Sequence, residues 1–243
     1  MDNELREAWV AESTAWIDFA RSEEADPVFW RFNLPAFLGI VPPHGSLTLD
    51  VGCGEGRLGR ALTAVGHRVI GVDTSPSLVA AASSHPLSLR AVLGSAAALP
   101  LGSAVADLVV LFMVVTDVDD LVATIEEGFR VLVAGGRLCI AMGHPLQGIG
   151  DFSGEDRDGP YVIQRPYFES RRLTYWAERA GQRVGLNFTH RPLSAYTAAL
   201  SSAGFLVESL TEPCPGHELE EHLSDLSQRR TIPSLLHLRA VKP

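Results

Sequence analysis

Short apolar runs that alternate with helical patterns constrain the fold of this chain more than any other feature. The alternation begins at residue 46 and continues to residue 142. Apolar runs predict strands at 47–51, 68–72, 87–93, 108–114 and 137–142, and helical spacing predicts helices at 57–65, 77–83 and 118–132. Strands joined through helices form right-handed crossovers, and the resulting parallel sheet is covered on both faces. We therefore expect an α/β fold with a doubly wound sheet.

The segment before this region predicts a helical addition to the sheet. Residues 3–22 carry large apolar side chains at helical spacing and predict an amphipathic helix. An aromatic stretch that we expect to be irregular follows at 27–40, and a Pro/Gly hinge closes it at 41–45. We expect residues 1–45 to form an N-terminal helical appendage and residues 46–243 to form the core.

The segment after residue 143 interrupts the alternation and then restores it. Residues 144–190 are rich in Gly, Pro, Asp and aromatic residues, and an insert of this length is usually functional or mobile. The pattern then predicts a helix at 192–203, a strand at 205–210, an acidic loop at 212–228 and a final strand at 231–241.

The charged residues exclude several kinds of chemistry. Lys242 is the only lysine, so the chain has no internal amine for a P-loop, a Schiff base or a lysine base. The formal net charge is -9, and no run of Lys and Arg forms a basic stripe. We therefore expect no nucleic-acid partner.

Signals for export, membrane insertion and metal binding are not found in the sequence. The first 26 residues carry eight acids, which is the opposite of a targeting segment, and no apolar run has the length of a membrane span. Cys53, Cys139 and Cys214 have neither CxxC spacing nor clustered histidines around them. We expect a reduced cytoplasmic protein that holds no metal and does not enter a membrane.

A glycine-rich turn between the first strand and the first helix indicates a nucleoside cofactor. Residues 49–56 read Leu-Asp-Val-Gly-Cys-Gly-Glu-Gly, a turn that lets a ligand approach the backbone closely. The dinucleotide fingerprint would place its third glycine where Arg57 stands, which argues against a nicotinamide oxidoreductase. Asp73 ends the second strand, where an acid can accept hydrogen bonds from both hydroxyls of a ribose.

With these motifs the chain resembles the class I S-adenosylmethionine-dependent methyltransferases, in particular the small-molecule branch of the ubiquinone- and menaquinone-biosynthesis type. The resemblance runs from about residue 9 onward and is carried by residues 49–56, 71–76, 94–100, 107–110, 130–138 and 203–205. It implies a Rossmann-like sheet of seven strands that is mostly parallel. It also implies that the last strand, 231–241, is antiparallel and inserts between strands five and six.

The resemblance also assigns the cofactor contacts residue by residue. It implies that three turn glycines face the methionine part, with an acid beneath them, and that Asp73 holds the ribose. Four further residues are implied to surround the adenine and two to lie under the cofactor near the sulfonium. The turn glycines are Gly52, Gly54 and Gly56, and the acid beneath them is Asp50. The adenine contacts are Thr74, Leu78, Ser95 and Ala96, and the residues near the sulfonium are Phe112 and Met113.

Methyl transfer from a sulfonium is an in-line displacement, so the enzyme mainly aligns the reactants and excludes water. A base is needed only where the acceptor atom carries a proton that must leave. His144 and His190, at the two ends of the insert, are candidate bases, and Tyr167 is a candidate for orienting the acceptor. Arg57 and Arg31 either meet the cofactor carboxylate or lie on the surface.

The N-terminal helix and the insert 144–190 are both rich in aromatic residues, so we expect a lid over a small apolar or aromatic acceptor.

Two other functions stay open. An RNA methyltransferase is disfavoured because Val114-Val115-Thr116-Asp117 stands where an Asn/Asp-Pro-Pro-Tyr/Phe motif would follow strand four. A non-catalytic S-adenosylmethionine-binding regulatory protein would share the same glycine turn. The sequence leaves open whether O, N or C is methylated, and whether the chain is a monomer or a homodimer.

Overall fold

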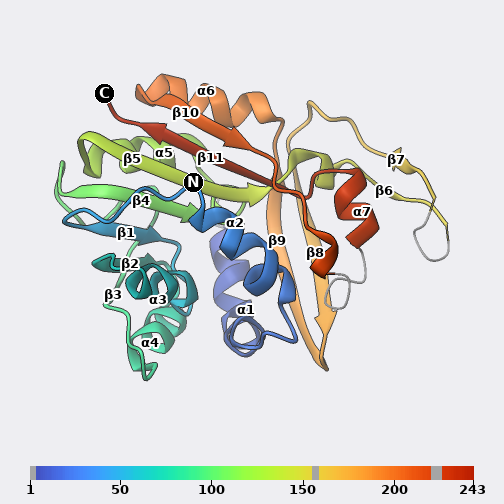
Figure 1. The fold of residues 1–243 in the computed structure, drawn as a ribbon, viewed down its shortest axis with the longest axis horizontal. Helices are drawn as coiled ribbons and strands as arrows, with labels where there is room; N and C mark the ends of the chain where they lie inside the picture. The colour runs from blue at the N-terminus through green and yellow to red at the C-terminus, as the bar shows by residue number, and fades with distance from the viewer. Residues whose placement is uncertain (1–3, 155–158, 220–225) are drawn as a thin grey trace.

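A seven-stranded sheet forms the centre of the computed structural model, which describes residues 4–154, 159–219 and 226–243. The strand order is β10-β11-β5-β4-β1-β2-β3 (Figure 1). The strands are β1 Thr48–Val51, β2 Val69–Asp73, β3 Ala91–Leu93, β4 Ala106–Phe112, β5 Leu132–Gly143, β10 Leu206–Thr211 and β11 Leu235–Val241. β11 runs antiparallel to β5 and β10, and the other pairs are parallel. The predicted Rossmann-like α/β fold is confirmed.

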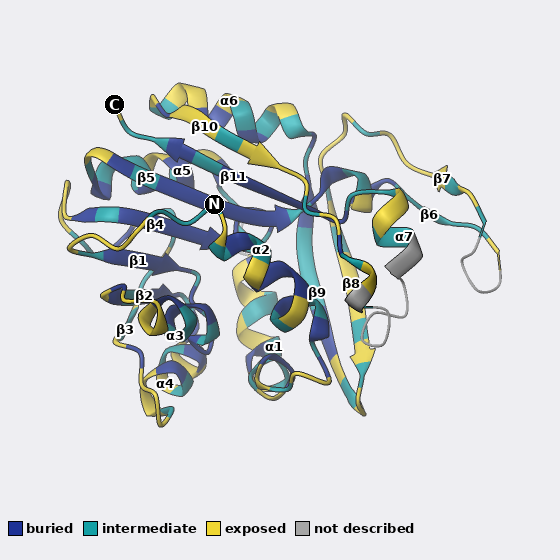
Figure 2. Cartoon of the chain, viewed as in Figure 1, coloured by how far each residue is buried: buried dark blue, intermediate teal, exposed yellow. Residues whose placement is uncertain are grey.

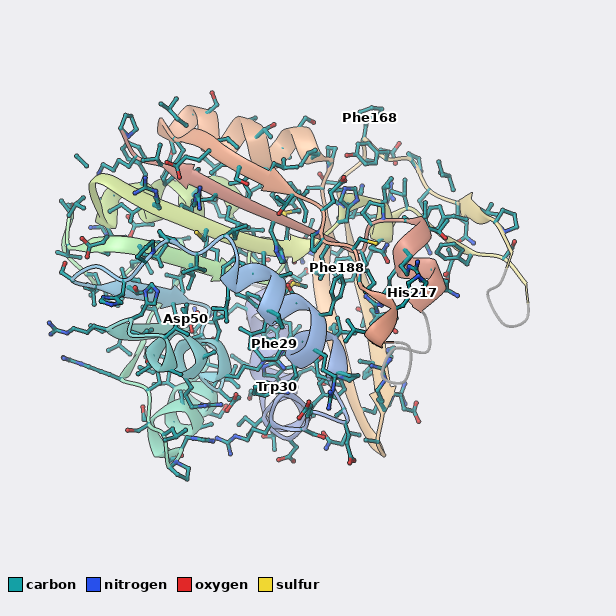
Figure 3. The ribbon with its side chains drawn as sticks, in the orientation of Figure 1. Phe29, Trp30, Asp50, Phe168, Phe188 and His217 are labelled. Carbon is teal, nitrogen blue, oxygen red and sulfur yellow. The ribbon has the colours of Figure 1, made fainter. Side chains whose placement is uncertain are left out.

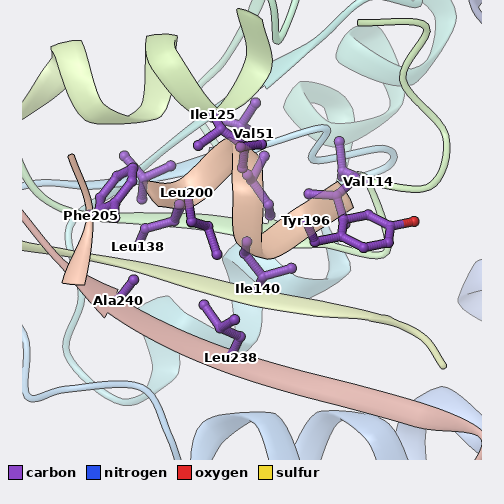
Figure 4. Close-up of a cluster of buried hydrophobic side chains, with 14 of the residues drawn as sticks. Val51, Val114, Ile125, Leu138, Ile140, Tyr196, Leu200, Phe205, Leu238 and Ala240 are labelled. Carbon is purple, nitrogen blue, oxygen red and sulfur yellow. The ribbon is translucent and has the colours of Figure 1, made fainter. Parts of the chain in front are cut away.

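Helices cover both faces of this sheet because neighbouring residues of a strand point to opposite faces. The helix α3 Arg57–Ala64 follows β1, α4 Pro76–Ser84 follows β2, α5 Leu121–Val131 follows β4, and α6 Leu193–Ala203 precedes β10. In β4, Val109 faces a cluster that includes Ile125 of α5 and Leu200 of α6 (Figure 4). Its neighbour Val110 faces a second cluster that includes Leu62 of α3. The strand β1, most of β4 and β11, and residues 138–142 of β5 are therefore buried (Figure 2).

The N-terminal segment is more regular than the sequence predicts. Helix α1 spans Glu4–Arg21, close to the predicted 3–22, of which residue 3 lies outside the described residues. The expectation of an irregular stretch at 27–40 is wrong, because a π-helix, η1 Phe29–Asn33, leads directly into α2 Leu34–Leu38. Proline usually breaks a helix, but Pro35 lies in the first turn of α2, where its missing N–H costs nothing.

The aromatic residues of this segment pack on the sheet. The rings of Phe29 and Phe37 meet Phe112 at the end of β4 edge-on, with centroids 5.5 and 5.0 Å apart. Phe37 is fully buried. The segment that contains η1 and α2 therefore covers one face of the sheet.

The insert contains regular secondary structure that was not predicted from the sequence. It holds a short helix and two antiparallel hairpins: η2 Pro145–Gly148, β6 Gly150–Phe152 with β7 Tyr161–Ile163, and β8 Arg171–Arg179 with β9 Gln182–His190. Ala180 and Gly181 join the long hairpin with φ angles of 52° and 72°. Positive φ at both central residues is the type I′ turn that fits the twist of a hairpin.

The remaining differences concern boundaries. The predicted loop 212–228 contains η3 His217–Leu219 and the start of α7 Leu226–Thr231, and residues 220–225 of it lie outside the described residues. The final strand begins at Leu235 rather than at residue 231. Among the residues that the structure describes, no helix combines the length and apolar character needed to cross a bilayer.

Candidate active site

A cavity of about 1040 Å³ opens at the carboxyl ends of the parallel strands. It is lined by the residues that follow β1, β2, β4 and β5, and it is closed from the other side by α1 and the β8–β9 hairpin. Asp50 on β1, Phe29 on η1 and Phe188 on β9 all line it and can be followed in Figure 3. Ligands of doubly wound folds bind at this edge of the sheet, and ligand pockets usually measure roughly 300–1,000 Å³.

The glycine turn and Asp73 form one hydrogen-bonded unit. Gly54 N donates to Asp73 Oδ2 over 2.8 Å, and Ser75 N donates to Asp73 Oδ1 over 2.9 Å. Burial raises the pKa of Asp73, and the backbone N–H groups of Ser75 and Gly54 oppose that rise. Gly52, Gly54 and Asp73 all line the cavity, so the structure brings the turn and the predicted ribose acid together.

Gly52 is required by the close approach of the segment after β4. Its φ is +73°, and a Cβ placed on it would lie 2.3 Å from Val114 Cγ2. Only glycine relieves both constraints, because other residues rarely adopt this φ and a side chain has no room. The turn after β1 and the turn after β4 are therefore packed directly on each other.

Asp50 lies beneath the turn as a buried acid, and one of its two carboxyl oxygens lacks a hydrogen-bond partner among the described residues. Its side chain is 1% exposed, and no residue in the described part of the chain forms a hydrogen bond to Oδ2. Burial raises its pKa to about 7, and the charge of Asp73 adds to the rise. An orphaned carboxylate oxygen on the cavity wall fits a ligand that carries positive charge, as S-adenosylmethionine does at its sulfonium and ammonium groups.

The predicted adenine contacts also surround the cavity. Thr74, Leu78, Ser95 and Ala96 all line it. Ser95 Oγ accepts from Ala97 N over 3.2 Å, which holds its loop in place. Gly56 is the one predicted turn glycine that is not among the lining residues; with a φ of 92° it begins α3 instead.

Phe112 is the last residue of β4, Met113 follows it, and both line the cavity. Met113 has a φ of 59°, which non-glycine residues seldom adopt, and its N–H donates to Ala141 O over 2.7 Å. Such backbone strain persists only where the surroundings impose it, and it concentrates at functional sites.

Both predicted histidines line the cavity, and hydrogen bonds hold both rings. His144 Nδ1 accepts from Leu146 N over 3.2 Å, and His144 Nε2 lies 2.9 Å from Glu212 Oε1. Burial lowers the pKa of His144, and Glu212 opposes this. His190 Nε2 lies 2.8 Å from the Tyr167 carbonyl oxygen, so Nε2 is the donor and carries the proton. Their catalytic roles stay predictions.

Tyr167 lies outside the predicted site, and Arg31 lies on the surface, one of the two places that the sequence left open. Tyr167 is not among the lining residues, and its hydroxyl accepts from Leu193 N over 3.0 Å at the start of α6. Arg31 is also outside the lining and pairs with Glu23 over 2.7 Å.

Arg57 does line the cavity, but it is buried rather than on the surface. Its guanidinium group pairs with Asp26 over 2.8 Å and lies 3.6 Å from the ring centroid of Phe29. Burial lowers the pKa of Arg57, and Asp26 opposes that change. Arg57 therefore fastens the N-terminal segment to the start of α3.

Helix α1 connects the two sides of the cavity. Ser13 Oγ lies 2.7 Å from Ser77 Oγ on α4, and Arg21 pairs with Glu55 beside the glycine turn over 3.0 Å. On the opposite side, Glu12 Oε2 accepts from Gly185 N of β9 over 3.1 Å. The helix therefore spans from the sheet to the hairpin.

The cavity wall also contains acids that were not predicted from the sequence, and Asp117 is one of them. Asp117 follows β4, lines the cavity, and accepts at Oδ1 from Thr116 Oγ1 over 2.8 Å. Burial raises its pKa to about 8 against the opposing effects of Thr116 and Arg191. The available signal was its position after a strand whose carboxyl end faces the site.

Comparison with known proteins agrees with this arrangement. Residues 49–140 match the family described as "Methyltransferase domain". A protein of Mycolicibacterium smegmatis named "Probable S-adenosylmethionine-dependent methyltransferase" is 37% identical over 92 residues. That match covers 38% of this chain and 36% of the relative, so the chain spans about a third of the length of this curated relative.

Solved structures of similar fold extend over nearly the whole chain. An S-adenosylmethionine-dependent methyltransferase from Mesorhizobium loti aligns with a TM-score of 0.69 and 20% identity, over 92% of this chain and 99% of that one. A glycopeptide N-methyltransferase complexed with S-adenosylhomocysteine aligns with a TM-score of 0.58 and 17% identity, over 86% of each chain. Residues 49–140 are therefore similar to a methyltransferase domain, and the solved structures show the same fold over nearly the whole chain.

Proposed function

We propose that this chain transfers a methyl group from S-adenosylmethionine to a small apolar or aromatic acceptor, in the manner of the small-molecule branch of ubiquinone- and menaquinone-biosynthesis type. The observation that carries the proposal is the carboxylate of Asp73, hydrogen-bonded to Gly54 N on the wall of the cavity. An acid held at the tip of the second strand beside a glycine turn is suited to a ribose.

The cofactor half of the cavity consists of the residues beside β1, β2 and β4. In the proposal Asp73 accepts from the ribose hydroxyls, the turn of Gly52 and Gly54 holds the methionine part, and Asp50 offers negative charge beneath it. Thr74, Leu78, Ser95 and Ala96 surround the adenine, and Phe112 and Met113 lie near the sulfonium. S-adenosylmethionine supplies the methyl group on a cationic sulfur, a good leaving group, so the protein mainly aligns the acceptor and keeps water out.

The acceptor half lies toward the insert and α1. Trp9 and Trp16 of α1, Tyr175 of β8 and Phe188 of β9 contribute aromatic lining. In the proposal α1 and the hairpin act as a lid, because their mutual contacts enclose the cavity away from the sheet. Aromatic walls with a few polar groups favour a small apolar or aromatic acceptor over a polymer.

Two alternatives make different predictions. An RNA methyltransferase would need a basic surface for the phosphate backbone, whereas this chain carries a net charge of -9. A regulatory protein would bind S-adenosylmethionine without turning it over.

The test is methyl transfer from S-[methyl-³H]adenosylmethionine to a panel of small aromatic amines, phenols and carboxylic acids, with transfer RNA as the competing substrate. We expect label in one or more small acceptors and none in RNA. Asp73→Asn should abolish transfer, and Asp18→Asn, which changes an exposed acid of α1 outside the cavity, should leave it unchanged. Label in RNA alone would favour the first alternative, and cofactor binding without transfer to any acceptor would favour the second.

A further inference from the structure

Asp117 lies in a turn that is fixed directly beside the glycine turn. Asp117 N donates to Val114 O over 2.7 Å and closes a tight turn, and the first residue of that turn, Val114, packs against Gly52. Asp117 therefore lines the cavity a few residues after Val114, the residue that packs against the glycine turn.

The turn is held from the acceptor side as well. Arg191 Nη1 donates to Val115 O over 3.2 Å and Arg191 Nη2 donates to Val118 O over 2.9 Å. Thr189 N of β9 donates to Thr116 O over 2.7 Å. These bonds tie the turn to the end of the insert, so the position of Asp117 is fixed relative to both halves of the cavity.

The carboxyl group of Asp117 forms few interactions with the rest of the protein. Within the described part of the chain, Thr116 Oγ1 is its one hydrogen-bond donor, and that bond reaches only Oδ1. Arg191 is the nearby cation, but it forms no ion pair with Asp117 and directs its Nη1 and Nη2 to backbone carbonyls. Tyr196 of α6 is the other titratable group that faces it, and burial raises the pKa of that phenol to about 12, so it stays neutral.

We propose that Asp117 is the general base of the methyl transfer and that the acceptor is a small amine, which enters the cavity as its ammonium ion. This inference rests on the proposed function. A carboxyl group that forms no ion pair on the wall of a cavity is balanced best by a cationic ligand, and Phe188 adds an aromatic side chain to the same lining. The two histidines are poorer candidates. Both ring nitrogens of His144 already have partners in the protein, and Nδ1 of His190 is covered by Gly148, where a Cβ would lie 2.7 Å from it.

The chemistry balances without a further reactant. The ammonium group gives one proton to Oδ2 of Asp117, which leaves a nitrogen lone pair. That lone pair forms the new N–C bond as the C–S bond breaks and its electron pair returns to sulfur. The products are a methylated ammonium ion, neutral S-adenosylhomocysteine and a neutral Asp117 carboxyl group, which then releases its proton to water. Burial raises the pKa of Asp117 to about 8. That value is closer to the pKa of an ammonium ion than the pKa of an ordinary carboxyl group is, and proton transfer is more efficient when the two pKa values are close.

The first test needs no turnover. Protein saturated with S-adenosylhomocysteine is titrated calorimetrically with 2-phenylethylamine and with 2-phenylethanol, which share a skeleton and differ in charge. We expect the wild type to bind the amine roughly 10- to 100-fold more tightly than the alcohol. Asp117→Asn should remove this preference and retain the affinity for S-adenosylhomocysteine, and Asp18→Asn should change neither.

The pH dependence gives a second readout. Below about pH 8 Asp117 holds a proton that the ammonium ion must displace, so amine affinity in the wild type should rise between pH 6 and pH 8. In Asp117→Asn it should be flat.

Turnover completes the test. The wild type should methylate amines, and the kcat of that reaction should be strongly reduced in Asp117→Asn. The inference is overturned if the loaded wild type binds no amine, if the amine and the alcohol bind equally, if Asp117→Asn keeps the preference, or if label appears only on hydroxyl groups. Failure of the wild type to bind S-adenosylhomocysteine would instead overturn the proposed function.

Discussion

The contact between Gly52 and Val114 makes a quantitative prediction about the glycine turn. The variant Gly52→Ala places a Cβ 2.3 Å from Val114 Cγ2 at a φ of +73°. The left-handed backbone costs an L-residue about 1–2 kcal/mol, and overpacking of this kind adds about 1–3 kcal/mol. We therefore expect Gly52→Ala to lower the free energy of unfolding by about 2–5 kcal/mol.

Gly135 provides a matched control. Its φ is +75°, nearly the same as that of Gly52, but no atom lies within 4 Å of a Cβ placed there. Gly135→Ala should therefore lose only the backbone contribution, about 1–2 kcal/mol. The difference between the two variants isolates the clash.

The assay is denaturant unfolding of both variants, together with calorimetric titration of S-adenosylhomocysteine. The double variant Gly52→Ala/Val114→Ala should be more stable than the sum of the single effects, because the smaller side chain removes the clash. Binding should weaken in Gly52→Ala and not in Gly135→Ala. Equal losses of stability in the two glycine variants, or strict additivity in the double variant, would refute this account of the turn.

Two further predictions concern buried charges. Because the pKa of Asp50 rises from 3.8 to about 7 on folding, the folded state retains a proton that the unfolded state releases, and stability falls as pH rises from about 4 to about 7. At about 1.4 kcal/mol per pKa unit the whole change amounts to about 4 kcal/mol, and about two units of it, about 3 kcal/mol, fall between pH 5 and pH 8. Urea unfolding should therefore show Asp50→Asn gaining about 3 kcal/mol of stability over the wild type across that range; a constant difference would contradict the assignment. Arg57→Met leaves Asp26 unpaired and should cost about 3 kcal/mol in thermal or denaturant unfolding, part of which Asp26→Asn restores in the double variant; full additivity would contradict a direct pair.

Sequence reasoning works where local pattern and tertiary structure coincide. The parallel strands are buried on both faces, so their apolar runs stand out, as in β4 Ala106–Phe112. The glycine turn and Asp73 are recognisable because their spacing is set by a strand, a turn and a neighbouring strand. The antiparallel placement of β11 came from the family resemblance and not from periodicity.

What sequence reasoning missed depends on contacts between distant segments. The β8 strand is largely exposed and its turn is Ala180-Gly181 rather than Asn-Gly, so neither pattern nor turn signal identified the hairpin. The burial of Arg57 depends on Asp26 and Phe29, which lie about 30 residues earlier in the chain. Asp117 resembles any other acid of its segment until Arg191, more than 70 residues later, is seen to hold its turn.

The most direct test of the central claim is calorimetric titration of S-adenosylhomocysteine into the wild type, Asp73→Asn and Asp18→Asn. The account predicts one binding site per chain in the wild type and in Asp18→Asn. Loss of two charge-assisted hydrogen bonds to the ribose should weaken binding to Asp73→Asn by about 3 kcal/mol, roughly 100-fold. Absence of binding by the wild type, or equal affinity in Asp73→Asn, would contradict it.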